Sequence, residues 1–64
     1  MSPHELKQLV LAEVKSEAAL AFINTRLILR TGVSLNDGHD VIEPQRLEAA
    51  IRELRAMGCL KEKR

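Results

Sequence analysis

Residues 3–31, PHELKQLVLAEVKSEAALAFINTRLILRT, decide the fold. This stretch has no glycine, and its one proline stands at its first position. It is rich in Leu, Ala, Glu and Lys, which favour helices. Ser2 can cap a helix that begins at Pro3, and Glu5 stands where it completes a capping box. We therefore predict one long helix, about 43 Å from end to end at 1.5 Å per residue, that ends before Gly32.

A second, shorter helix is predicted from about residue 44 to residue 57, after Pro44. Its apolar residues follow the spacing i, i+3, i+4, i+7 and i+10, which indicates one apolar stripe. They are Leu47, Ala50, Ile51, Leu54 and Met57. Gly58 can end this helix, with Cys59 and Leu60 folding back as its apolar cap. Residues 61–64 are predicted to be a solvated tail.

Residues 32–43 break the helical pattern and form the predicted connection. The turn signal Asn36-Asp37-Gly38 lies at its centre, with short apolar pairs on both sides. Those pairs could form two very short strands, but we favour a loop that they pin to the core. The predicted fold is thus all-α: a helical hairpin made of a long helix, a structured loop and a short helix.

The long helix carries two apolar stripes about 160° apart, at 100° per residue. One comprises Leu11, Val14, Ala18, Ala21, Phe22, Thr25, Ile28 and Leu29. The other comprises Leu9, Ala12, Ser16, Ala19, Leu20, Ile23 and Leu27. The second helix, about 21 Å long, can cover only one stripe, so the other would face water in a monomer.

We therefore predict self-association of two hairpins into a four-helix bundle. The predicted interface consists of Leu9, Leu20, Ile23 and Leu27, with Asn24 setting the helix register, as a buried Asn can. The apolar stripe could instead meet a larger protein. In a further alternative, the first helix kinks or ends near Ser16, and the monomer closes as three helices.

Composition excludes several classes of function. The chain has 64 residues, 45% of them hydrophobic, a net charge of +1 and one cysteine. No apolar run approaches the roughly 18 residues that span a membrane, and the first residues do not resemble a secretory signal. We therefore expect a single cytoplasmic domain with no membrane contact. Phe22 is the only Phe, Tyr or Trp, which argues against stacking on single-stranded nucleic acid.

The sequence shows no convergent set of catalytic or metal-binding residues. His39 lies in a polar turn whose spacing matches neither a calcium loop nor a zinc site. Cys59 follows the end of a helix, where the helix dipole does not lower a thiol pKa. We therefore predict a non-catalytic protein–protein interaction module, such as a regulator or adaptor, without a cofactor.

Two weaker contact sites remain. The loop residues Asn36, Asp37 and His39 could touch a partner, because ordered loops of this length often carry function. The second helix carries Arg46, Arg52 and Arg55. In the alternative function, a dimer would present these arginines to nucleic acid, and its binding would depend steeply on salt.

Overall fold

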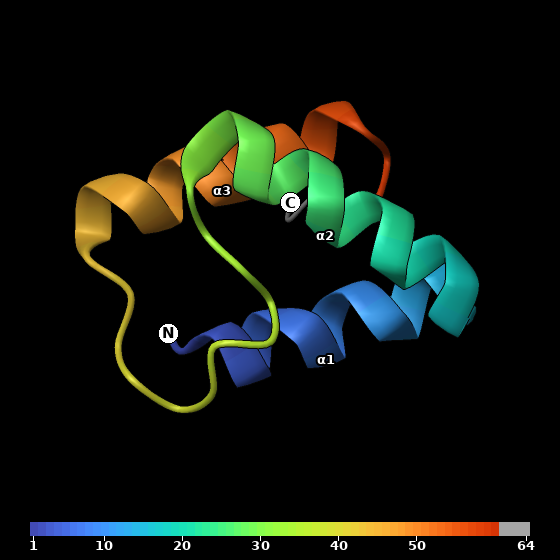
Figure 1. The fold of residues 1–64 in the computed structure, drawn as a ribbon, viewed down its shortest axis with the longest axis horizontal. Coiled ribbons are helices and arrows are strands. Elements are labelled where there is room, and N and C mark those ends of the chain that lie inside the picture. Colours follow the sequence, from blue (N-terminus) through green and yellow to red (C-terminus); the bar gives the residue numbers. More distant parts are fainter. Residues whose placement is uncertain (61–64) are drawn as a thin grey trace.

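A computed structural model describes residues 1–60, which form three helices joined by a tight corner and a longer loop (Figure 1). The helices are α1 (Pro3–Val14), α2 (Glu17–Thr31) and α3 (Pro44–Ala56). Helix α2 packs against both other helices, whereas no Cα of α1 lies within 8 Å of a Cα of α3. The all-α prediction is confirmed, with no strand in residues 1–60. The predicted tail, 61–64, lies outside the described residues.

The prediction of one helix over residues 3–31 is wrong, because the chain turns at Lys15 and Ser16. Lys15 adopts a left-handed conformation, with φ 58°, and its N–H donates to the Leu11 carbonyl at 2.9 Å. Ser16 is extended, and its hydroxyl accepts a hydrogen bond from the Ala19 N–H at 3.3 Å. Ser16 is thus an N-cap, and the alternative in which the helix ends near Ser16 is the correct one.

Burial explains why the helix is interrupted despite its uniform helix propensity. The corner lets α1 fold back along α2, so that Leu6 and Val10 of α1 join Leu20, Ile23 and Leu27 of α2 in one core. A continuous helix would hold the two halves apart and expose these side chains. Each large apolar side chain gains about 1.5–3 kcal/mol on full burial, which outweighs the cost of about 1–2 kcal/mol for a left-handed residue.

The loop between α2 and α3 is pinned to the core, as we predicted, and forms no strand. Val33, Leu35 and Ile42 bury their side chains beneath it. Its backbone also bonds to the start of the chain: the His4 N–H donates to the Gly38 carbonyl at 2.9 Å, and the Ile42 N–H to the Met1 carbonyl at 3.1 Å. The loop accordingly runs from α2 to the beginning of α1 before it reaches α3 (Figure 1).

The helix ends follow the predicted capping rules. Ser2 and Glu5 form a complete capping box at the start of α1. Gly32 ends α2 in the left-handed conformation, with φ 77°. After α3, the Cys59 N–H donates to the Leu54 carbonyl at 2.8 Å, which buries Cys59 beside the helix end as predicted. None of the three helices is long and apolar enough to cross a membrane.

Candidate interaction surface

Most of the predicted interface lies inside the molecule. Leu20, Ile23 and Leu27 are 5%, 8% and 0% exposed, because α1, the loop and α3 all pack on this side of α2. The expectation that their stripe faces water was therefore wrong for α2. Of the predicted apolar residues only Leu9, on α1, is exposed, because the corner at Lys15 interrupts the stripe between the two helices.

Asn24 anchors the loop rather than facing a second helix of another chain. Its Oδ1 accepts a hydrogen bond from the Leu35 N–H at 2.7 Å, and its Nδ2 donates to the Ser34 hydroxyl at 3.4 Å. The side chain is 9% exposed. Its amide therefore satisfies a buried backbone N–H, which would otherwise cost about 1–3 kcal/mol. This contact accounts for the buried Asn24, and the proposed role in dimer register is not needed.

The opposite side of α2 is exposed and uncharged. We call this surface the α2 outer face; it consists of Ala18, Ala21, Phe22, Thr25, Ile28 and Leu29, all of them exposed. It belongs to the stripe that we expected the second helix to cover. Three of its side chains are large and apolar: Phe22 is 71% exposed, Leu29 81% and Ile28 43%. Isolated exposed apolar residues are normal, but a contiguous set on one helix makes this face a candidate binding surface.

Two details make the α2 outer face less polar than its composition suggests. The Thr25 hydroxyl donates to the Ala21 carbonyl of its own helix at 3.0 Å, so the only polar group of the face already has a partner. Arg26, at the edge of the face, has its Nε 3.5 Å from Glu53 Oε2 of α3, and Arg30 Nε lies 3.8 Å from the same oxygen. A partner could therefore cover the face without burying an unpaired charge.

A second apolar surface lies between α1 and α3, on the side away from α2. It is a groove of about 590 Å³. Its lining comprises Met1, Leu6, Leu9, Ala12, Glu13, Ile51, Arg55 and Leu60. The groove exists because α1 and α3 each pack on α2 but not on one another. Leu9, which is 46% exposed, lines this groove, and none of the lining residues belongs to α2.

The three arginines of α3 do not form one basic face. At 100° per residue, Arg46 stands about 180° around the helix from Arg55. Arg52 and Arg55 line a hollow of about 520 Å³ with Glu48, which lies 3.6 Å from Arg52. Arg46 lines a different pocket beside Gly32. On a single chain the three side chains therefore do not share one face, and nucleic-acid binding by a dimer stays a prediction.

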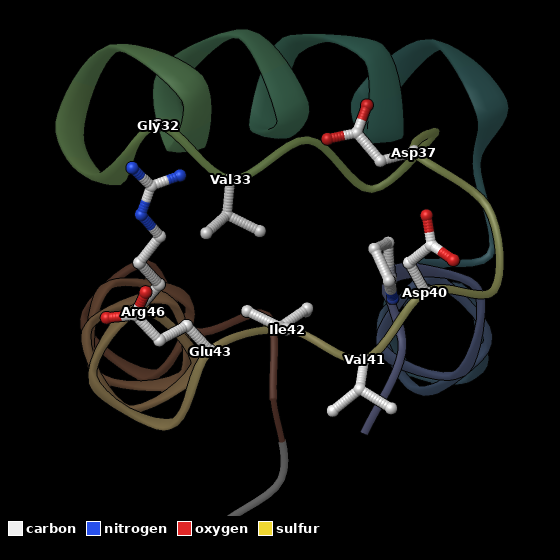
Figure 2. A pocket seen from close by; sticks show the side chains of 9 residues that line it. Gly32, Val33, Asp37, Asp40, Val41, Ile42, Glu43 and Arg46 are labelled. Carbon is white, nitrogen blue, oxygen red and sulfur yellow. The ribbon is translucent and has the colours of Figure 1, made fainter.

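The loop residues surround a shallow polar pocket of about 360 Å³ (Figure 2). Asp37 and Asp40 stand at one end, Arg46 reaches toward Gly32 at the other, and Val33 lies between them. The three predicted contact residues of the loop, Asn36, Asp37 and His39, lie in different surroundings. Asp37 lines the pocket, whereas the His39 ring packs against His4, with ring centroids 4.6 Å apart. The exposed Asn36 donates its backbone N–H to the Ser34 hydroxyl at 3.2 Å.

Cys59 is held in the core, where burial raises the pKa of its thiol. It is 4% exposed, and its sulfur lies 3.8 Å from the Met57 carbonyl. A raised pKa keeps the thiol protonated and slows nucleophilic attack. In residues 1–60, no three His, Cys, Asp or Glu side chains are grouped so that they could hold a metal ion.

The residues of the α2 outer face were visible in the sequence as an apolar stripe. Sequence spacing could not show which stripe faces inward, because that depends on the turn at Lys15. Comparison with protein-family models gave no match, and neither curated proteins nor solved structures include one significantly similar to this chain.

Proposed function

We propose that the chain is a small non-catalytic protein–protein interaction module that binds its partner through the α2 outer face. One observation carries this proposal: Phe22, the only Phe, Tyr or Trp of the chain, is 71% exposed at the middle of an uncharged helix face. A chain that used its one large aromatic for stability would bury it. Aromatic side chains on a surface are typical anchors of protein interfaces.

The energetics support an interface of modest strength. Covering Phe22, Ile28 and Leu29 would stabilise a complex by about 1.5–3 kcal/mol for each side chain that becomes fully buried. Association costs about 4–15 kcal/mol of lost freedom. The face alone therefore supports a reversible complex, as expected for a regulator or adaptor. A partner that also filled the α1–α3 groove would bind more tightly.

A photo-crosslinking experiment tests this proposal. A benzophenone amino acid replaces Phe22 in one variant and Gln45, an exposed residue of α3, in the control. Both variants are expressed and irradiated in the cells that produce the chain. We expect discrete protein adducts from position 22 and none of the same mass from position 45. Equal labelling at both positions, or no discrete adduct at position 22, would contradict the proposal.

A further inference from the structure

We infer that the partner of the α2 outer face is a second copy of this chain, bound with the two α2 helices antiparallel. This inference rests on the proposed function and adds the identity and direction of the partner. It follows from how the sizes of the side chains are distributed along the face. The small Ala18 lies at one end of the face and the large Ile28 and Leu29 lie at the other, with Phe22 and the smaller Thr25 between them.

An antiparallel pair places the largest side chains of the face against smaller ones. With the two-fold axis between Ile23 and Asn24, Leu29 of one copy stands opposite Ala18 of the other. Phe22 of one copy stands opposite Thr25 of the other, whose hydroxyl is already bonded to its own helix. Close-packed interfaces need such alternation, because two large side chains at one level hold the backbones apart.

A parallel pair gives the opposite result. Phe22 would meet Phe22, Leu29 would meet Leu29, and Ala18 would meet Ala18. The helices would be held apart at two levels and would leave a void at the third, where the lining atoms lose their packing contacts. The antiparallel arrangement also sets the positive end of each helix dipole beside the negative end of the other.

The charges at the margins permit this pairing. The basic edge of the face, Arg26, already lies against Glu53 of its own chain, at 3.5 Å. Glu17 of one copy comes to the level of Arg30 of the other, so that each end of the pair carries both signs of charge. No like charges are forced together at the centre, where the face contains only Phe22, Thr25 and alanine.

The contact is small, so the dimer is weak. The α2 helix is about 22 Å long, and a single helix pair lies at the low end of specific interfaces. We expect a dissociation constant on the order of 0.1 mM. Light scattering from about 10 µM to about 1 mM should therefore show the mean mass rising from one chain toward two.

Two matched variants locate the interface. Leu29→Glu places a charge in the apolar contact with Ala18 of the other copy, at each end of the antiparallel pair, and should weaken dimerisation at least about tenfold. Val41→Glu is the control, because Val41 is 79% exposed but lies in the loop, away from the face. It should leave the dissociation constant unchanged. A dimer that both substitutions weaken equally, or that neither weakens, would overturn the assignment to α2.

Disulfide trapping determines the direction. Ala18→Cys mixed with Leu29→Cys should form the mixed disulfide, whereas Ala18→Cys alone should not self-link, because its copies lie about 16 Å apart along the antiparallel pair. The unsubstituted chain reports the background from Cys59. Self-linked Ala18→Cys without the mixed product would overturn the antiparallel arrangement.

The two proposals fail in different ways. A strict monomer at about 1 mM, together with a Phe22 adduct to another protein, overturns self-pairing and supports the interaction module. A strict monomer without any adduct overturns both.

Discussion

The two sides of α2 are both apolar, yet they have opposite roles. The inner side, with Leu20, Ile23 and Leu27, receives α1, the loop and α3. The outer side, with Phe22 and Leu29, receives nothing within the described chain. Hydrophobicity does not distinguish the two sides, since the outer side carries Phe22, the largest apolar side chain of the helix. The polar residues do: the inner Asn24 bonds to a distant backbone group, whereas the outer Thr25 bonds to its own helix.

The largest contrast is expected between two leucines of α2. Leu27→Ala removes a side chain that is 0% exposed and should lower the free energy of unfolding by about 2–5 kcal/mol. Leu29→Ala removes one that is 81% exposed and should change it by less than about 0.5 kcal/mol. Urea unfolding at low micromolar concentration measures both. Similar losses for the two variants would contradict the assignment of inner and outer sides.

The polar pair gives the next largest effect. Asn24→Leu deprives the buried Leu35 N–H of its acceptor and should destabilise the fold by about 1–3 kcal/mol. Thr25→Val is the matched control, and it should be nearly neutral because its hydroxyl bonds only within the helix. A role for Asn24 in a dimer seam predicts the opposite, since Leu there would stabilise the protein. Higher stability of Asn24→Leu would thus contradict the loop anchor.

The corner at Lys15 determines which side of α2 is buried, and it can be tested by whether a single substitution there raises or lowers the stability of the protein. Lys15→Gly relieves a left-handed residue and should stabilise the protein by up to about 1 kcal/mol. In a continuous helix the same change would destabilise it by about 1 kcal/mol. Thermal unfolding of Lys15→Gly beside Ala49→Gly, an exposed interior position of α3, separates the two cases. A lower melting temperature in both variants would contradict the corner and favour a continuous helix over residues 3–31.

The smallest effect is expected at Glu5, which belongs to neither side of α2. The Ser2 backbone N–H and then its hydroxyl hold the pKa of this carboxyl below its usual value. A lowered folded-state pKa means that Glu5 contributes stability above the unfolded-state pKa, and that this is lost as pH falls through the folded-state value. The stability curves of the unsubstituted chain and Glu5→Gln should therefore converge in acid. Curves that stay parallel would contradict a charge-dependent cap.

Local signals made much of this fold predictable. The capping box at Ser2, the helix end at Gly32 and the apolar cap at Cys59 depend on neighbouring residues, and the structure confirms each. The sequence predicts the break at Ser16 only as an alternative, because residues 4–31 contain no glycine or proline and are rich in helix-favouring residues. What decides it is tertiary burial of Leu6 and Val10, which the local sequence does not express.

The candidate surface was harder to predict than the fold. Helical spacing identified both stripes of α2, but the choice between them depends on the loop, which brings Leu35 and Ile42 to one side only. Asn24 was the sequence signal that could have identified the inner side. A buried amide needs hydrogen-bond partners. A polar residue within an apolar stripe therefore marks a side that is buried, either against loop backbone, as here, or against another helix.

The bonds between the loop and the start of the chain have a consequence for folding kinetics. Helices form within about a microsecond, but α1 gains its contacts with Gly38 and Ile42 only when that distant segment closes onto it. During synthesis at about 5–20 residues per second, α1 and α2 emerge seconds before residue 42 does. Until then, the inner side of α2 lacks the contacts that Leu35 and Ile42 of the loop make with it. Formation of α1 and α2 alone therefore does not complete the fold, which also needs this later segment to close onto α1.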